Sequence, residues 1–390
     1  MFKKLFINKN TIYIFMFIFF TSLFLSYRDP LENIFITIAF LGLILIIKNI
    51  SFLNDKNNLI AFIICIIIFY IMSVLFIYNQ HYPITKKSNL RNNNSDIAVL
   101  LVYDGESPKY NMSKSITNIN LKDEIVNKAM LPFSLNKIKK QYKSIGKSNY
   151  KSNTKKIADE VNRILSNEYK IYLGYLYDTP YIEEEINQIL TDGHNKIITV
   201  PIYLTKNKSY CLFRERINKM HLSKTNAQIR HTKDLVDSES IFNSFINKIN
   251  SNINKEKLLN TGIVLIGSQE GSKESTEKDF AFRNKIKEYL IEYLKISEDR
   301  IAICWDNNSG SNYIKEVKKM LEYGVGEILC IYVKPSVTYI ENNLIINNLL
   351  NEIELPDGAK IKVIDGFLED NNFIYDIKRR VRSKNVIEWN

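Results

Sequence analysis

Polar residues follow four apolar segments of this chain, at points where strands of a parallel sheet would end. These stretches are residues 104–110, 178–179, 268–273 and 334–343. Because ligands of open α/β sheets bind at the carboxyl ends of the strands, we expect the functional side chains to lie in these stretches. Asp104 could bind a metal ion or act as a base there. It also precedes Gly105, and an aspartate in that position is typical of an ordinary turn.

Cysteine and histidine spacing provides no recognisable metal motif. Cys65, Cys211, Cys304 and Cys330 contain neither a CxxC pair nor zinc spacing, so neither a disulfide framework nor a thiolate metal site is predicted. Cys304 and Cys330 lie within apolar runs and are expected in the core. The histidines, at positions 81, 194, 221 and 231, fall in a polar tether, a helix-to-strand turn and a basic connector.

Alternating strands and helices are predicted to position the polar stretches. The first group of strands covers residues 96–103, 170–177 and 196–204, with a helix that begins at Pro180. The second group covers residues 262–267, 300–305 and 327–333, with helices over about 278–295 and from about 312. Nearly continuous apolar strands separated by helices indicate an α/β fold with parallel sheets covered on both faces.

The two groups of strands indicate an internal duplication. The segment YIEEEINQILTDG, residues 181–193, matches YIKEVKKMLEYG, residues 313–324, and each leads into an apolar strand. We therefore expect two similar halves, residues 96–255 and residues 256–390.

The N-terminal region is apolar enough to cross a lipid bilayer. Apolar runs cover residues 11–27 and 59–78, and a shorter run covers about 33–48. A helix needs about 20 apolar residues to span the bilayer core. No small-residue cleavage site follows the first run, which disfavours a removed signal peptide. Residues 1–79 are therefore predicted to be a transmembrane region, and residues 80–95 a polar tether.

The distribution of charge bears on the orientation of the protein in the membrane and on its partners. Basic residues near the spans favour a cytoplasmic N-terminus by a single residue, so three spans would leave the α/β part outside the cytoplasm. The formal net charge of +11 suits an anionic partner. Basic residues are spread along the whole chain without an RNA-binding aromatic motif. We therefore expect an integral protein of the cell membrane whose surface lies near anionic lipid, with no nucleic-acid partner.

The ordered set of segments resembles the ferrochelatases. LLVYDGESPKY, residues 100–110, is similar to their first strand and loop, and YKSIGKSN, residues 142–149, follows in the same order. GFLEDNNFIYDIKRRV, residues 366–381, resembles the family's closing segment. The related sirohydrochlorin cobaltochelatases match residues 181–204 about as well. This resemblance covers about residues 96–383 and implies two chelatase-like, flavodoxin-like halves.

The resemblance implies that a divalent metal, Fe²⁺ or Co²⁺, is inserted into a tetrapyrrole such as a porphyrin, as in heme biosynthesis. The metal is then a substrate, and no resident cofactor is required. Insertion removes two pyrrole protons, so it needs a base and borderline metal ligands on one face of the ring. Ferrochelatases supply a histidine after the strand that opens their second half and a glutamate after a later strand.

The resemblance carries these two positions onto Gln269 and Glu341. Gln269, or Ser268 with a shift, stands where the histidine is expected, and glutamine is neither a base near neutral pH nor an imidazole-like ligand. Gln269 could instead bind a ring carboxylate or cap the loop, while Glu270 could act as a displaced base. Glu341 could also be a solvated helix residue. The candidate metal ligands are Glu341, Asp104 and Glu270.

Aromatic residues near strand ends could contact a flat macrocycle. Tyr103, Tyr110 and Trp305 are candidates, although aromatic side chains at strand ends also serve in packing. Tyr339 and Ser268 complete the expected tetrapyrrole-binding set. We expect one cleft lined by residues 104–110, 268–273 and 338–342.

Two interpretations stay open. The chain is an active, membrane-anchored metal chelatase that works through Glu341, or it is a lapsed chelatase fold that binds a tetrapyrrole or metal. The lapsed form could also serve as an interaction module for an unknown protein partner. The missing histidine favours the second interpretation, and Glu341 with the two-half architecture keeps the first. A periplasmic-type binding protein is a more distant alternative that rests on topology alone.

Overall fold

The computed structural model describes residues 9–84, 96–121, 128–165, 168–222, 227–268, 271–306, 312–386 and 389. The chain forms two compact units. Unit 1 comprises Met1–Pro83 and Ser107–Lys147, and unit 2 comprises Ile84–Glu106 and Ser148–Asn390. Most of the predicted tether, residues 85–95, lies outside the described residues.

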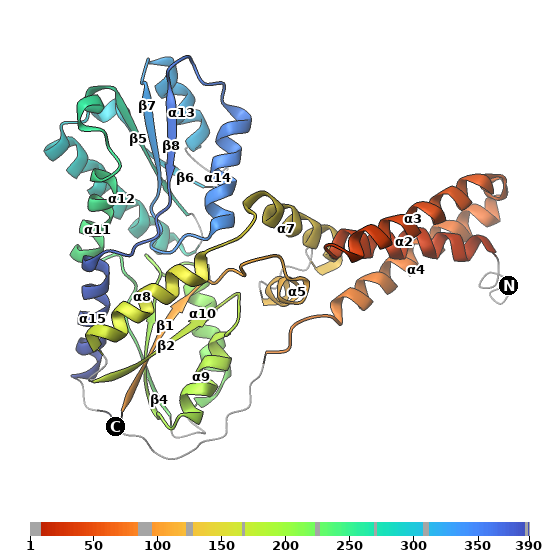
Figure 1. Ribbon diagram of the computed structural model, residues 1–390, viewed down its shortest axis with the longest axis horizontal. Helices are drawn as coiled ribbons and strands as arrows, with labels where there is room; N and C mark the ends of the chain where they lie inside the picture. Colours follow the sequence, from red (N-terminus) through yellow and green to blue (C-terminus); the bar gives the residue numbers. More distant parts are fainter. Residues whose placement is uncertain are drawn as a thin grey trace. The chain divides into compact units, whose positions relative to one another are not determined.

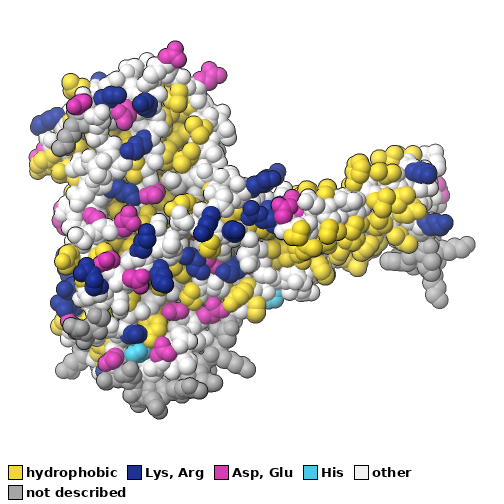
Figure 2. All heavy atoms as spheres, viewed as in Figure 1, with side chains coloured by type: hydrophobic (Ala, Val, Ile, Leu, Met, Phe, Trp, Pro, Cys, Tyr) yellow, Lys and Arg dark blue, Asp and Glu magenta, His cyan; other side chains and the backbone are white. Residues whose placement is uncertain are grey.

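Unit 1 is built from helices (Figure 1). Its three long helices are α2 (Lys9–Ser26), α3 (Leu31–Lys48) and α4 (Lys56–Tyr78), with a short 3-10 helix η1 (Ile50–Asn54) between the last two. Each of the three is long and apolar enough to cross a membrane. Figure 2 shows apolar side chains covering the outside of these helices, and Phe40 is 60% exposed. Helices that are apolar on all sides are typical of membrane spans.

Two further helices, α5 (Met112–Leu121) and α7 (Leu131–Ile145), also belong to unit 1. The predicted segment boundaries assigned them to the first half of the α/β part. On α7, Lys139 donates hydrogen bonds to the carbonyl oxygens of Phe24 and Tyr27, at 2.8 and 3.1 Å. These carbonyls stand at the C-terminal end of α2, where no further helical turn can satisfy them.

Unit 2 contains two four-stranded parallel sheets with the same topology. In the order β2-β1-β3-β4, the first sheet consists of β1 (Ile97–Tyr103), β2 (Tyr169–Tyr175), β3 (Lys196–Pro201) and β4 (Gln228–His231). In the order β6-β5-β7-β8, the second consists of β5 (Thr261–Gly267), β6 (Ile301–Trp305), β7 (Glu327–Tyr332) and β8 (Lys360–Ile364). The predicted α/β class with two parallel sheets is confirmed.

The sequence prediction missed β4 and β8, one at an edge of each sheet. The sequence of β4 is QIRH, and all four of its residues are only half-buried. The sequence of β8 is KIKVI, in which exposed and half-buried residues alternate before the last position. Edge strands lack the continuous apolar run that marks a central parallel strand. His231 therefore belongs to a strand, and its assignment to a connector was wrong.

Helices cover both faces of the sheets (Figure 1). They are α8 (Tyr150–Leu165), α9 (Ile182–Thr191), α10 (Lys208–Lys219), α11 (Glu239–Asn250), α12 (Lys273–Leu294), α13 (Tyr313–Glu322), α14 (Tyr339–Glu352) and α15 (Asn371–Asn385). Short 3-10 helices, η3 (Lys255–Asn260) and η4 (Glu298–Arg300), precede β5 and β6. The last helix, α15, packs against α8 and α11 of the first half. One apolar cluster contains residues of both sheets, including Val99 and Leu329.

The two matched segments, residues 181–193 and 313–324, occupy equivalent places in the two halves in a register that differs by one residue from the sequence match. Isolated bridges join Tyr175 to Tyr181 in the first half and Trp305 to Asn312 in the second. Tyr181 is thus the counterpart of Asn312, whereas the sequence match pairs Tyr181 with Tyr313. With this shift of one residue, the buried positions of α13 coincide with buried positions of α9. Equivalent helices are expected to agree in this way, because their buried faces pack on equivalent sheets.

Candidate functional site

Charged side chains from both halves meet at the carboxyl ends of the strands in unit 2. Asp104 follows β1 directly, and Lys334 follows β7. The Lys334 Nζ lies 3.4 Å from Oδ2 of Asp104 and 2.6 Å from Oε1 of Glu341. The side chains of Lys334 and Asp104 are only 12% and 6% exposed, and that of Glu341 is 33% exposed. One ammonium group therefore joins a carboxylate of the first half to a carboxylate of the second.

Electrostatic coupling fixes the charge states of Lys334 and Glu341. Burial favours the neutral form of Glu341, but Lys334 and the hydrogen bonds of Thr338 outweigh it and lower the pKa of Glu341. Burial also opposes the charge of Lys334, and the carboxylates of Glu341 and Asp104 raise its pKa well above the ordinary value. The pair is thus held as carboxylate and ammonium near neutral pH.

Glu341 also forms part of a helix cap. Its Oε2 accepts hydrogen bonds from the backbone N–H and the hydroxyl of Thr338, at 2.9 and 3.0 Å. In return the backbone N–H of Glu341 donates to Oγ1 of Thr338 at 3.2 Å. This reciprocal arrangement is a capping box at the N-terminus of α14. Glu341 is therefore an ordered side chain with both oxygens bonded, and not a solvated helix residue.

The second oxygen of Asp104 lies among buried phenols. Among the described residues, Oδ1 of Asp104 and the hydroxyls of Tyr103 and Tyr203 are buried without a well-formed hydrogen bond. Burial, and then the charge of Asp104, raise the pKa of Tyr203 well above its ordinary value. Tyr150 lies in the same group, with its hydroxyl 2.6 Å from Oγ of Ser336. The protein thus keeps several strong hydrogen-bonding atoms beside Asp104.

Glu106 makes a second link between the halves. It is 4% exposed and accepts hydrogen bonds from the backbone N–H groups of Tyr339 and Ile340, at 3.0 and 2.9 Å, and from the Ser148 hydroxyl. Burial raises the pKa of Glu106. A carboxylate at the first turn of a helix stabilises the positive end of its dipole. The sequence prediction missed this residue, although it falls within the stretch 104–110.

Asp306 is a further carboxyl group that the sequence prediction missed. It follows β6 and accepts a hydrogen bond of 2.5 Å from the Tyr332 hydroxyl. Burial raises the pKa of Asp306, and a hydrogen bond from Ser268 opposes that shift. Ser268, expected to bind a tetrapyrrole, therefore lies beside Asp306 at the end of the second sheet. The signal for Asp306 was its position directly after an apolar strand.

Other predicted site residues have different surroundings. Gln269 and Glu270 lie outside the described residues. Tyr110 belongs to unit 1, where its hydroxyl donates to the carbonyl oxygen of Ser26 at 2.5 Å. Trp305 packs over the guanidinium group of Arg283, at 4.1 Å from the ring centroid. The structure therefore brings Asp104 and Glu341 together with Tyr103 nearby in the same unit, whereas Tyr110 and Trp305 have structural contacts.

The cluster does not form a ready site for a divalent metal. Among the described residues, no group of three or more His, Cys, Asp or Glu side chains is arranged to hold one. The predicted ligands Asp104 and Glu341 both pair with Lys334. A metal ion approaching them would meet an ammonium group of the same sign.

Three cavities in unit 2 have other linings. Their volumes are about 440, 490 and 440 Å³. The first lies by α10 and β4, the second by α13 and α14, and the third by α8 and β2. None of the three is lined by Asp104, Lys334 or Glu341. The low exposure of Asp104 and Lys334 makes the cluster a largely buried, polar contact between the two halves.

Solved structures similar to this chain include two of the chelatase SirB. SirB from Bacillus subtilis with Fe³⁺ is 14% identical, with a TM-score of 0.48, covering 74% of this chain and 95% of that chain. The sirohydrochlorin chelatase SirB from Bacillus subtilis subspecies spizizenii, in complex with cobalt, is 12% identical, with a TM-score of 0.47, covering 74% and 94%. CbiX, described as the terminal enzyme of siroheme biosynthesis in denitrifying bacteria, is 9% identical, with a TM-score of 0.40, covering 74% and 98%.

Sequence comparison identifies the family. No curated protein matches the chain. The ferrochelatase family model matches residues 111–313, which is more than half of the chain. This match includes most of the first half, β5, β6 and the segment that contains Gln269, and it ends before Glu341. By this match, the chain belongs to the ferrochelatase family.

Proposed function

We propose that this protein is a membrane-anchored member of the ferrochelatase family that binds a tetrapyrrole and inserts metal into it slowly or not at all. The observation that carries the proposal is the pairing of Lys334 with both Glu341 and Asp104. These are the two described carboxylates that the sequence assigned to metal binding.

The lysine opposes each part of the insertion reaction. A general base is most effective when its pKa lies near the working pH, and Lys334 with Thr338 lowers the pKa of Glu341. A divalent metal bound by Glu341 would require the ammonium of Lys334 to move away or lose its proton, and its raised pKa disfavours the loss. Glu341 thus stabilises the contact between halves at the expense of its use as a base or ligand.

Binding of the macrocycle is supported by the polar ends of the strands. The family match supports a tetrapyrrole as the ligand, and Lys334 could exchange one of its carboxylate partners for a carboxylate of the macrocycle. The apolar surfaces of α2, α3 and α4 would hold the protein in a bilayer, where a flat, largely apolar ring also partitions. The transmembrane helices and the α/β part would then both contribute to binding the same ligand.

An active chelatase is the second candidate. It is supported by the family match, which includes the segment around Gln269 and Glu270. In that case a base other than Glu341 would remove the pyrrole protons, and Glu270 is the nearest acidic candidate in the sequence.

A metal-insertion assay separates the two candidates. The full-length chain in lipid nanodiscs is mixed with a dicarboxylate porphyrin and Fe²⁺ or Co²⁺, and the visible spectrum reports the metallated ring. We expect slow insertion by the wild type and at least about a 10-fold gain in Gln269→His, because a general base commonly contributes about 10²–10⁴-fold. Gln269→Asn is the matched control and should give no gain.

The double variant Gln269→His with Glu341→Gln should lose that gain, because the new histidine needs a carboxylate opposite it. Wild-type insertion at ordinary enzymatic rates would establish the active chelatase and overturn the slow-insertion proposal.

Orientation in the membrane is a separate proposal. We place the α/β part outside the cytoplasm, on the basis of three spans and the small excess of basic residues on the N-terminal side. Cys211 is exposed and would first be replaced by serine. A Ser88→Cys variant in intact cells should then react with an impermeant maleimide, and protection of that cysteine would reverse the orientation.

A further inference from the structure

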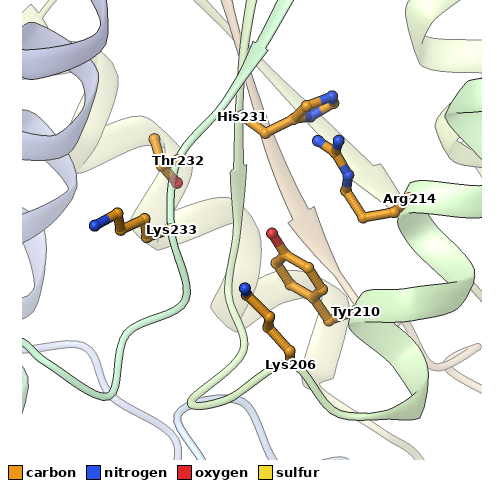
Figure 3. A pocket seen from close by; sticks show the side chains of 6 residues that line it. All are labelled: Lys206, Tyr210, Arg214, His231, Thr232 and Lys233. Atoms are coloured by element: carbon orange, nitrogen blue, oxygen red, sulfur yellow. The ribbon is translucent and has the colours of Figure 1, made fainter.

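A basic cavity lies at the ends of β3 and β4, beside the first turns of α10 (Figure 3). Its volume is about 440 Å³, and its lining consists of Lys206, Tyr210, Arg214, His231, Thr232 and Lys233. The lining comes from three neighbouring pieces of chain: the loop after β3, the helix α10, and β4 with the residues after it. Figure 3 shows Lys206, Tyr210, Arg214 and His231 around a common space, with the Lys233 side chain extending away from these four.

The cavity carries an excess of positive charge. In the described part of the chain, Lys206, Arg214 and Lys233 form no ion pair, in contrast to the paired lysine between the halves. The nearby carboxylate is Asp234, on which Lys206, Lys278 and Arg380 all act. Lys278 and Arg380 lie outside the lining and act on Asp234 together with Lys206, and the six lining residues include no Asp or Glu, so the lining keeps a net positive charge.

Thr232 adds an unpartnered polar group to this lining. The residue is 2% exposed, and its Oγ1 is buried without a hydrogen-bond partner in the described part of the chain. In Figure 3 this oxygen is on the side of Thr232 that faces Tyr210. A buried hydroxyl without a partner is destabilising, so its retention at a basic cavity indicates a missing ligand atom.

The remaining neutral groups are also suited to an anion. Nδ1 of His231 lies 2.6 Å from Oγ1 of Thr199, so this nitrogen is engaged within the protein and Nε2 is left for a ligand. The Tyr210 hydroxyl is half-buried, and the cation of Arg214 acts on it. Two hydroxyls, an imidazole and the cations of Lys206 and Arg214 therefore line one space from different elements, and Lys233 adds positive charge at its edge.

We propose that this cavity binds a phosphate-bearing anion, either a small phosphate monoester or the phosphate of a lipid headgroup. A phosphate monoester carries about −1.5 to −2 charge and three acceptor oxygens near neutral pH. The planar guanidinium group of Arg214 can bind two of these oxygens at once, whereas Lys206 and Lys233 act as point charges. The hydroxyl of Thr232 donates to the third. The site is distinct from the cluster around Lys334, which does not line the cavity.

Binding can be measured by calorimetry on the full-length chain in an uncharged detergent and a phosphate-free buffer. The probes are inorganic phosphate, glycerol 3-phosphate and, in nanodiscs, phosphatidic acid compared with phosphatidylcholine. We expect saturable binding of a phosphate probe, weakened at least about 10-fold in Arg214→Gln, since hydrogen bonds to charged groups are among the strongest. Binding of glycerol 3-phosphate identifies a soluble ester, and binding of phosphatidic acid alone identifies a lipid headgroup.

Two further variants distinguish a loss of phosphate binding from a loss of folding and from a change in net charge. Thr232→Val removes an unpartnered hydroxyl without leaving a cavity, so it should weaken phosphate binding several-fold while the melting temperature is kept. Lys315→Gln removes an exposed lysine of α13, far from the lining in sequence, and should leave binding unchanged. The proposal is overturned if no phosphate probe binds saturably, or if Lys315→Gln weakens binding as much as Arg214→Gln.

Discussion

The two halves of unit 2 share a topology but carry opposite charges after two strands that are not equivalent, β1 in the first half and β7 in the second. β1 and β5 are the second strands in sheets of the same order, and an isolated bridge occurs at the same place in each half. After β1 the chain continues with the carboxylates of Asp104 and Glu106. After β7 it continues with Lys334. The halves are thus complementary, and the cation of one neutralises the carboxylate of the other.

The two halves also differ in the helix that carries a buried arginine. Arg216 on α10 pairs with Glu183 and donates to the carbonyl oxygen of Leu176 at 2.6 Å. Arg283 on α12 pairs with Asp279 and donates to the carbonyl oxygen of Cys304 at 2.5 Å. Each arginine satisfies a carbonyl near the end of an outer strand, but from a different helix. The two halves therefore share a backbone plan, while their buried polar contacts differ.

The largest expected effect comes from removing the cation that joins the halves. Lys334→Met leaves Asp104 and Glu341 buried without their counter-ion, so we expect a loss of about 3–5 kcal/mol in the free energy of unfolding. Chemical denaturation of the full-length chain, followed by tryptophan fluorescence, measures this loss. Lys287→Met, which breaks an exposed pair with Glu298, should cost no more than about 1 kcal/mol. Equal losses in the two variants would show that the halves do not depend on Lys334.

The next effect concerns a carboxyl group of the first half. Burial raises the pKa of Glu185, on α9, to about 7. The unfolded pKa is lower, so the folded state prefers the protonated form, and stability falls as pH rises from about 4.5 toward 7. Glu185→Gln mimics that neutral form. It should raise the free energy of unfolding by up to about 3 kcal/mol above pH 7 and change it little near pH 4.

Unfolding midpoints of the wild type and Glu185→Gln, measured from pH 4 to pH 8, give this difference directly. Parallel curves for the two proteins would contradict a raised pKa at this position.

The smallest expected effect concerns the N-terminal caps of α10 and α14. These helices follow the third strand, in chain order, of each half. Thr338 caps α14, and Asn207 caps α10 by accepting from the backbone N–H of Tyr210 at 2.9 Å. Replacing either cap by alanine should cost about 1 kcal/mol. Thermal unfolding should therefore give similar shifts for Thr338→Ala and Asn207→Ala, and Thr338→Ser should retain most of the wild-type stability. A shift for Thr338→Ala several times larger than for Asn207→Ala would mean that Thr338 also holds the contact between the halves.

The apolar pattern made the central strands predictable. Each of β1, β3, β5 and β7 is almost entirely buried, so a continuous apolar run marks it in the sequence. The edge strands β4 and β8 lack that pattern. The assignment of α5 and α7 to unit 1 was also beyond sequence reasoning, because it depends on long-range packing and not on local periodicity.

The candidate site was predictable only in part. Asp104 could be named because polar residues after parallel strands meet at one edge of a sheet, and Glu341 because the resemblance to the ferrochelatases carries their glutamate onto it. Two contacts could not be predicted: the pairing of Lys334 with Asp104, and the cap that Glu106 forms on α14. Each joins residues more than 200 positions apart. Charge pairing across such distances leaves no periodic signal in a single sequence.

A porphyrin titration tests the central claim of tetrapyrrole binding most directly. The full-length wild type in nanodiscs is titrated with a dicarboxylate porphyrin, with empty nanodiscs as the control for partition into lipid. We predict a saturable shift of the main absorption band in the wild type and in Gln269→His, and an unchanged shift in Arg214→Gln, whose side chain lines the separate basic cavity. A titration in which both the wild type and Gln269→His behave as empty nanodiscs would contradict tetrapyrrole binding.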